Sequence, residues 1–277
     1  MTVLVTGATG NVGRLVVDEL VARGVPVRAL TVDPERAALP ESVEVVVGSL
    51  AKPSTLPAAL SGVESVYLAP YARTVSRFCE LAQKAGIRRV VALSGSSAGD
   101  THPASSGHGF AAVEKAVEAA GFDWTFLRPG AFMLNSLGWA GSIRERGEVR
   151  SAYPGAVQTP IDLADIAAVA ARVLVAEGHG GRIYGLSGPE GISLAEMAAV
   201  IGEVLGKPVP FVELTPEEQV AEWVGAGYPE GVASWLLENF EATVRRPQVP
   251  TGVVEELLGR GGVSFAEWVK GNVAAFS

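Results

Sequence analysis

The chain has 277 residues and a formal net charge of −8 at pH 7, so it is long enough for one large α/β domain with an appended lobe. Because no basic run exceeds two residues, no apolar stretch approaches the roughly 20 residues of a membrane span and no cationic leader is present, we expect a cytoplasmic protein with no nucleic-acid or membrane partner. The single cysteine, Cys79, excludes an internal disulfide and should be a small core residue, and no metal site is expected because no cysteine–histidine cluster has ligand spacing.

Short runs rich in valine and leucine alternate with helix-period segments through the first two thirds of the chain. Such continuous apolar runs are typical of parallel strands that are buried on both faces of a sheet. They predict strands at residues 2–6, 25–31, 43–47, 64–69, 88–94, 123–127 and 182–186. The helical pattern predicts helices at 13–23, 72–85 and 108–120. This alternation indicates an α/β fold with a doubly wound parallel sheet.

After about residue 190 the pattern changes to helices separated by proline and glycine. They are predicted at 193–205, 215–225, 230–243 and 264–275. We therefore expect a sheet domain over residues 1–190 and a smaller, mainly helical lobe over 191–277, with some residues of 133–160 contributing to the lobe. The lobe should cover the carboxyl edge of the sheet.

A glycine-rich turn joins the first strand to the first helix. In "VLVTGATGNVGRLVVDEL" the glycines Gly7, Gly10 and Gly13 follow an apolar strand in the spacing G-x-x-G-x-x-G. Glycine there permits a tight turn, close approach of the backbone to a pyrophosphate and close packing of helix on strand. The placement of the turn predicts a dinucleotide cofactor.

The end of the second strand indicates which cofactor is used. An acidic residue there favours the ribose of NAD, whereas a nearby arginine accommodates the 2′-phosphate of NADP. The strand ends "RALTVDPER", so Asp33 comes late and Arg36 can fold back over a phosphate. We expect NADP(H), with NAD(H) as the alternative.

Several motifs occur in an order that resembles a known family. They are "TGATGNVGR" (6–14), "VVVGSL" (45–50), "LSGVESVYLAP" (60–70), "EKAVEAAGFDWTFLRPGAFMLN" (114–135) and "TPIDLADIAAVAARVL" (159–174). Over about residues 1–210 the chain resembles the atypical short-chain dehydrogenase/reductase group and, within it, the NmrA-like NAD(P)H-binding proteins. The resemblance implies a Rossmann-like domain with a small substrate lobe. Its members include carbonyl reductases, quinone reductases and nucleotide-sensing regulators, so fold alone does not fix function.

By position, the resemblance implies cofactor contacts at four strand ends. The residues expected at the pyrophosphate are Gly7, Thr9, Gly10, Asn11, Val12 and Gly13. Those expected beside adenine are Gly48, Ser49 and Leu50, although family members often carry aspartate where this chain has Ser49. Those expected along the nicotinamide ribose are Ala69, Pro70 and Tyr71. Those expected to wall the nicotinamide are Pro129, Gly130, Ala131 and Phe132.

Many relatives pair a serine after the fifth strand with a Tyr-x-x-x-Lys on the next helix, where the phenol protonates the substrate carbonyl. In "VVALSGSSAG" either Ser94 or Ser96 can take the serine position, and Ser96 matches better. The helix "SSGHGFAAVEK" (105–115) contains no tyrosine. Alignment on Glu114 places Phe110 at the lysine position and Ser106 at the tyrosine position, so this register lacks the pair.

The other register, on Lys115, places Ala111 at the tyrosine position. Lys115 should point away from the apolar helix face and lie in solvent. His108 is then the remaining candidate on this helix, because a free histidine side chain titrates in a range that suits proton exchange. His102 and His179 lie in loops and are weaker candidates. Water or the substrate is the alternative proton source.

Two function hypotheses follow. The first is an NAD(P)H-dependent reductase that sends hydride to the carbonyl of an aromatic ketone or quinone-like molecule, as in the tailoring of a polyketide antibiotic, where a phenol beside the ketone polarises it. Flat apolar surfaces for such a ring are expected from Trp139, Trp223, Tyr228 and Trp235. The second is a non-catalytic NAD(P)-sensing regulator, which the missing tyrosine favours and the complete helical lobe disfavours.

Overall fold

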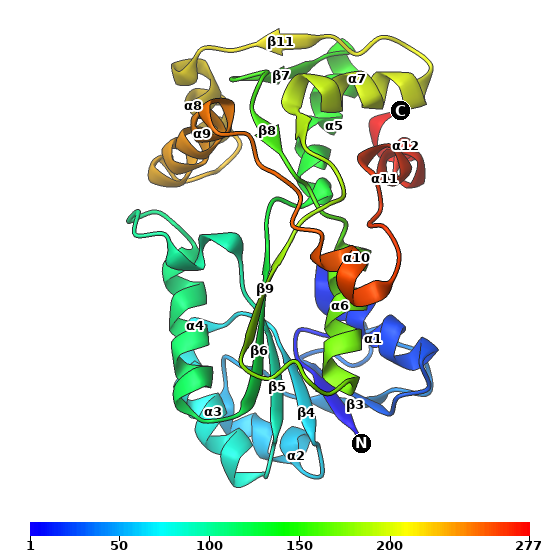
Figure 1. The fold of residues 1–277 in the computed structure, drawn as a ribbon, viewed down its shortest axis with the longest axis vertical. Helices are drawn as coiled ribbons and strands as arrows, with labels where there is room; N and C mark the ends of the chain where they lie inside the picture. Colours follow the sequence, from blue (N-terminus) through cyan, green and yellow to red (C-terminus); the bar gives the residue numbers. More distant parts are fainter.

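Seven strands form one parallel sheet in the larger lobe of the computed structural model, which describes residues 1–277 (Figure 1). In spatial order the strands are β3 (Glu44–Val47), β2 (Val27–Thr31), β1 (Val3–Val5), β4 (Ser65–Leu68), β5 (Arg89–Leu93), β6 (Asp123–Pro129) and β9 (Arg182–Leu186). Each neighbouring pair is parallel. The predicted strands and the doubly wound, Rossmann-like fold are confirmed.

Helices cover both faces of this sheet (Figure 1). Because side chains alternate along a strand, Val3 and Val5 pack into one core with the helices of one face while Leu4 packs into the other. The first face carries α1 (Asn11–Ala22) and α6 (Leu163–Val175). The second carries α2 (Leu56–Leu60), α3 (Val75–Lys84) and α4 (Gly107–Ala119). Two buried layers therefore fix the sheet, as continuous apolar strands require.

Cys79 lies in the second of these cores. Burial raises the pKa of its thiol to about 11. The thiol therefore stays protonated and unreactive at neutral pH, and Cys79 is the small core residue that the sequence predicts.

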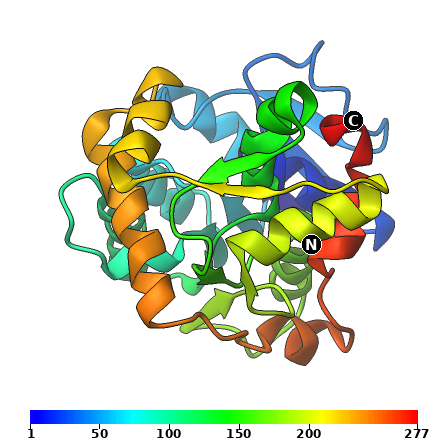
Figure 2. The same ribbon diagram turned by 90° about the horizontal axis from the view of Figure 1, so that it is seen from above.

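The smaller lobe lies over the carboxyl edge of the sheet (Figure 2). Its strands form two short ribbons, β7 (Val149–Ser151) with β11 (Phe211–Glu213) and β8 (Val157–Gln158) with β10 (Ile192–Ser193). Its helices are α5 (Ala140–Arg146), α7 (Leu194–Leu205), α8 (Pro216–Gly225), α9 (Glu230–Arg245), α11 (Phe265–Gly271) and α12 (Val273–Phe276). A third core gathers around Met133, Met197 and Phe265. None of the helices is both long and apolar enough to span a bilayer.

The chain passes between the two lobes repeatedly (Figure 1). After α9 it returns to the sheet domain, where α10 (Val253–Leu258) packs against α6 through Val254, and then it enters the small lobe again. Asp165 of α6 holds this last crossing: its carboxylate contacts Nη1 of Arg260 at 2.8 Å and accepts the backbone N–H of Val263 at 2.7 Å. The residue range expected for the small lobe thus includes one helix that packs on the sheet domain.

Periodicity does not reveal three kinds of element. The helix α6 was not among the predicted helices; its residues are buried on nearly every side because the sheet, α1 and α10 surround it. The ribbons of the small lobe are strands of two or three residues, too short to alternate visibly. The helix predicted at 264–275 is divided at Asn272, where the backbone leaves the helical region and ends α11.

Tyr67 on β4 supplies a test of the core. Its side chain is 1% exposed, its hydroxyl has no hydrogen-bond partner among the protein groups, and burial raises its pKa. Since an unsatisfied buried polar group costs about 1–3 kcal/mol, we expect Tyr67→Phe to leave the free energy of unfolding unchanged or to raise it by about 1 kcal/mol. Denaturant unfolding measures this.

Tyr184→Phe is the matched control. The Tyr184 hydroxyl lies 2.8 Å from Nδ1 of His179, so its removal should lower the free energy of unfolding by about 0.5–1.5 kcal/mol. A loss at Tyr67 as large as that at Tyr184 would show that the Tyr67 hydroxyl is bonded in solution.

Candidate functional site

The ends of β1 and β4 meet where the strand order reverses direction. Thr6 joins them, because its hydroxyl donates to the carbonyl of Tyr67 at 3.0 Å and accepts the N–H of Ala69 at 2.8 Å. In doubly wound sheets, a crevice forms outside the carboxyl ends of the strands at this point. The predicted cofactor loops after β1 and β4 therefore lie side by side.

The glycine turn is built as a cradle. Gly7 has φ +61°, in the left-handed region, and a Cβ on it would lie 2.9 Å from Cβ of Ala69. A Cβ on Gly13 would lie 2.1 Å from the carbonyl oxygen of Gly7, so α1 can approach the loop this closely only with glycine at that position. Gly10 is the N-cap of α1 and has no side-chain cap, which leaves the positive end of the helix open to an anion.

The remaining residues expected at the pyrophosphate lie around this helix end. Thr9 and Asn11 are exposed, whereas Val12 is buried in the core beneath the loop. The backbone of Val12 can face a phosphate, but its side chain anchors α1. The turn has the form that a dinucleotide pyrophosphate requires.

On the adenine side, the loop after β3 is tied down by hydrogen bonds. The N–H of Gly48 donates to the carbonyl of Thr31 at 2.8 Å, the N–H of Ser49 donates to the Thr55 hydroxyl at 3.0 Å, and the carbonyl of Leu50 accepts the Thr74 hydroxyl at 2.5 Å.

Two exposed valines stand beside this loop. Val32 follows β2 with 71% of its surface exposed, and Val47 ends β3 with 61% exposed. Val32 could not be recognised from the sequence as an exposed apolar residue beside the adenine loop, because a single apolar residue at a strand end carries no periodic signal.

Two arginines lie at the loop after β2. Arg36 is 88% exposed and only loosely paired with Asp33, at 3.9 Å, so its guanidinium is free to reach a bound anion. Arg14, which the sequence analysis did not select, donates to the carbonyl of Ala38 at 2.8 Å and so fastens the same loop to α1. Its position directly after Gly13 was the available signal.

The loops expected at the nicotinamide follow β4 and β6, on either side of β5. Ala69 and Tyr71 are half-buried, and Pro70 is exposed. After β6, the buried Pro129 is followed by Gly130, whose N–H donates to the carbonyl of Leu186 at 3.0 Å.

The next two residues continue along the base of the small lobe. The carbonyl of Ala131 accepts the N–H of Ile161 at 2.9 Å, and the half-buried Phe132 packs against the first core. The structure therefore brings these loops to the same edge of the sheet as the phosphate loop.

The two candidate serines have different environments. Ser94 is buried, and its hydroxyl donates to Oε1 of Glu114 at 2.5 Å. Glu114 also receives Nε and Nη2 of Arg128 at 2.9 and 2.6 Å, and this bidentate pairing raises the pKa of Arg128. Ser96 is exposed at the first position of a short 3₁₀ turn, Ser96–Gly99. Only Ser96 has a hydroxyl that a substrate can reach.

The titratable groups of α4 are not arranged as an acid. His108 is exposed, and its Nε2 lies 3.0 Å from the carbonyl of His102; because a carbonyl only accepts, Nε2 carries the proton and donates there. Lys115 is exposed, as the helical pattern predicts. Neither side chain forms a pair with a phenol, since α4 has none.

The aromatic side chains of the small lobe mainly connect one element to another. The indole Nε1 of Trp235 donates to Oδ2 of Asp100 at 2.7 Å and so links α9 to the segment before α4. Trp223 packs against Tyr228 and Phe240, with ring centroids 6.4 and 5.7 Å away. These rings pack the α8–α9 hairpin.

Trp139 and His179 lie elsewhere. Trp139 packs against the third core. His179, in the loop before β9, has its pKa lowered chiefly by burial.

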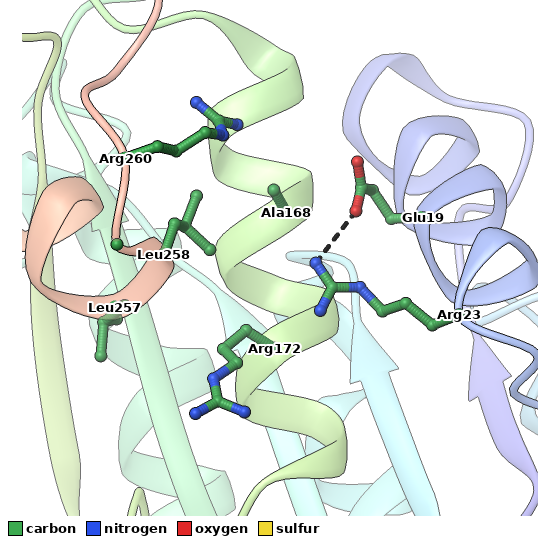
Figure 3. Close-up of a pocket in the computed structure, with 8 residues that line it drawn as sticks. Glu19, Arg23, Ala168, Arg172, Leu257, Leu258 and Arg260 are labelled. Carbon is green, nitrogen blue, oxygen red and sulfur yellow. Dashed lines mark hydrogen bonds and ion pairs between the residues drawn. The ribbon is translucent and has the colours of Figure 1, made fainter.

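A groove on the opposite side of the sheet domain is not this site (Figure 3). It runs between α1, α6 and α10, and four of its eight lining residues are charged: Glu19, Arg23, Arg172 and Arg260. Glu19 and Arg23 lie at the end of α1 away from Gly10 and pair with each other at 3.1 Å. The groove therefore faces away from the loops that can hold a dinucleotide.

A family model described as NAD(P)H-binding matches residues 7–177, more than half of the chain. The chain belongs to this NAD(P)H-binding family. Its glycine cradle fits a dinucleotide, and the NAD(P)H-binding family expected from the motifs is confirmed. The crystal structure of an NmrA mutant, at 19% identity and a TM-score of 0.76, shares the fold.

Similar proteins cover the whole chain. It is 38% identical to a (4-alkanoyl-5-oxo-2,5-dihydrofuran-3-yl)methyl phosphate reductase of Streptomyces griseus and 34% identical to an NAD(P)H azoreductase of Xenophilus azovorans, and each match covers 99% of both chains. The crystal structure of an NADPH-dependent quinone oxidoreductase from Escherichia coli superposes with a TM-score of 0.85 at 28% identity, covering 99% of this chain and 100% of that one. The chain is therefore an NAD(P)H-dependent oxidoreductase that reduces a small molecule, which decides between the two function hypotheses.

Gly10→Asp tests the cradle. The dihedral angles of Gly10, φ −86° and ψ 173°, suit any residue, but a Cβ there would lie 3.3 Å from the Gly7 carbonyl oxygen. Because aspartate is a favoured N-cap, which offsets this tight contact, the melting temperature should change little. The new carboxylate faces the pyrophosphate, so cofactor binding should be lost in calorimetry.

Gly10→Asn is the matched control, because it has the same size without the charge and should bind more tightly than the aspartate variant. Unchanged affinity in Gly10→Asp would remove this loop from the cofactor site.

Proposed function

We propose that the enzyme reduces a conjugated, electron-poor carbonyl compound, a quinone or an aromatic ketone with a hydroxyl beside it, and that no protein side chain acts as the acid. The observation that carries this proposal is the environment of Ser96, an exposed neutral hydroxyl beside a helix with no tyrosine and with the Nε2–H of His108 already engaged. An aromatic polyketide whose ketone has a neighbouring hydroxyl falls within this class.

Charge delocalisation supports this choice of acceptor. When hydride adds to an isolated ketone, the negative charge stays on one oxygen and an acid must meet it in the transition state. When hydride adds to a quinone, the charge spreads over the ring, so protonation can follow from water. The names of relatives are consistent with this, because quinones and azo compounds are both conjugated acceptors.

The reaction balances with one external proton. The reduced nicotinamide supplies a hydride, which is two electrons and one proton; a quinone takes the hydride and then one proton from water to become a hydroquinone. The protein binds the cofactor, holds the acceptor against it and excludes competing orientations. In this proposal Pro129, Gly130, Ala131 and Phe132 wall the nicotinamide, Ala69, Pro70 and Tyr71 border its ribose, and Ser96 donates a hydrogen bond to the acceptor oxygen.

Two arginines, Arg36 after β2 and Arg14 within α1, support a preference for NADPH. Arg36 is exposed and loosely paired, and Arg14 holds the loop that carries it. No carboxylate precedes Asp33 at the end of β2, and the Asp33 carboxylate already receives the N–H of Arg36 at 3.2 Å. A 2′-phosphate bound here would thus be attracted by the Arg36 guanidinium more than it is repelled by the Asp33 carboxylate.

Arg36→Ala tests this preference. A hydrogen bond to a charged group is worth about 1.5–3 kcal/mol, so the variant should bind NADPH about tenfold or more weakly and bind NADH nearly as well as the parent. Titration of cofactor fluorescence measures both.

Arg77→Ala is the matched control, since Arg77 is another exposed arginine with a carboxylate three residues away, and it should change neither affinity. Equal losses for both cofactors in Arg36→Ala would contradict the assignment.

Steady-state reduction of an aromatic ketone with a hydroxyl beside the carbonyl tests the proton source, because the charge that hydride leaves on a ketone stays on one oxygen. We expect Ser96→Ala and His108→Ala each to retain turnover, with losses below about a hundredfold, because a full acid–base group contributes about 10²–10⁴. NADPH affinity should be unchanged in both. The analogue that lacks the hydroxyl should lose more rate with the parent enzyme than either substitution causes.

His108 would be the proton donor instead if the turnover of His108→Ala fell to background with cofactor affinity intact, while the parent enzyme turned over the analogue without the hydroxyl at the normal rate.

A further inference from the structure

One face of α4 contacts the segment after β5 almost residue by residue. Gly107 and Phe110 lie one turn apart on this face. A Cβ on Gly107 would lie 1.8 Å from the carbonyl oxygen of Ser97, and a Cβ on Gly95 would lie 2.6 Å from Cε2 of Phe110. The two elements thus approach so closely that glycine is required on one side of each contact.

Glu114 completes this face one turn after Phe110. Its buried carboxylate binds Ser94 at 2.5 Å and Arg128 at 2.9 and 2.6 Å. Residues of α4 thus contact Ser94, Gly95 and Ser97. Ser96, between them, has none of these contacts and is exposed. The helix therefore holds the backbone on both sides of Ser96 and leaves its side chain in the crevice.

We infer that Ser94 and Glu114 are positioning residues for Ser96. A buried carboxylate must keep its partners, because an unpaired charge in the interior is costly, and charge-assisted hydrogen bonds are short and strong. The Ser94 hydroxyl is therefore committed to Glu114 and cannot also donate to a substrate. The inference rests on the proposed function in one respect only, that Ser96 contacts the acceptor.

A double-mutant cycle on turnover separates positioning from an independent role. Ser94→Ala removes the hydroxyl and leaves the Glu114–Arg128 pair in place. We expect kcat to fall about tenfold with KM for NADPH changed less than about twofold, because small displacements of a reacting group cost rate rather than cofactor binding. In a Ser96→Ala background the same substitution should cost less than about twofold, since its target is already gone. Losses that multiply would overturn the inference.

Hydrogen exchange tests positioning without turnover. In Ser94→Ala the amides of residues 94–99 should exchange about tenfold faster than in the parent, while those of α1 should change less. The melting temperature should fall, because the buried Glu114 loses one charge-assisted hydrogen bond. Ser76→Ala, on the exposed side of α3, is the matched control and should change neither exchange nor kcat. Unchanged exchange in Ser94→Ala would overturn the inference whether or not the enzyme is active. If the parent binds NADPH but reduces no quinone or ketone, the proposed function fails while the exchange result still decides the role of Ser94.

Discussion

The buried carboxylate of Asp165 fixes how the two lobes meet. It is fully buried near the start of α6, where Oδ2 accepts the N–H of Val263 and Oδ1, which has no hydrogen-bond partner, is contacted by the half-exposed Arg260; both groups come from the segment that leaves α10 for the small lobe. Loss of either contact leaves the buried carboxylate less well compensated, at a cost of about 1–3 kcal/mol or more. The crossing cannot move away from α6 without that cost, so the small lobe stays over the carboxyl edge of the sheet.

With that crossing fixed, the crevice is defined by strand ends rather than by a deep cavity. The glycine turn after β1 and the loop after β4 share the Thr6 bridge, while the segment after β6 is tied to Ile161. The α8–α9 hairpin buries few side chains and meets the sheet domain through Trp235 and Asp100. Weakly buried elements open at low free-energy cost, so this hairpin is held less firmly than the strand ends that define the crevice.

The sequence predicts those parts of the molecule whose physics is local. Apolar runs identify every strand of the sheet, and the three glycines identify the cradle, because the left-handed backbone of Gly7 and the approach of Gly10 and Gly13 to its carbonyl arise within one turn. The helix α6 escaped detection since its surroundings, not its periodicity, make it a helix with apolar residues on all sides. The ion pair of Glu114 and Arg128 could not be predicted from the sequence either. The two residues lie 14 positions apart on different elements, and only the packing of α4 on β6 brings them together. Ser94 and Ser96 could be nominated from their position, but their opposite exposure depends on that same packing.

The absence of the tyrosine and that of the lysine are best understood together. A phenol without a neighbouring cation keeps a high pKa and transfers a proton poorly at neutral pH, so neither residue is useful alone. In this chain the helix face that would carry them packs instead on the loop after β5, with the ring of Phe110 against Gly95 and the carboxylate of Glu114 on Ser94. The site thereby loses an acid and gains a rigidly held, neutral hydroxyl beside an aromatic ring. Under the proposed function, such a site would leave charge on a single oxygen unneutralised, which is why that proposal names acceptors that disperse or neutralise the charge themselves.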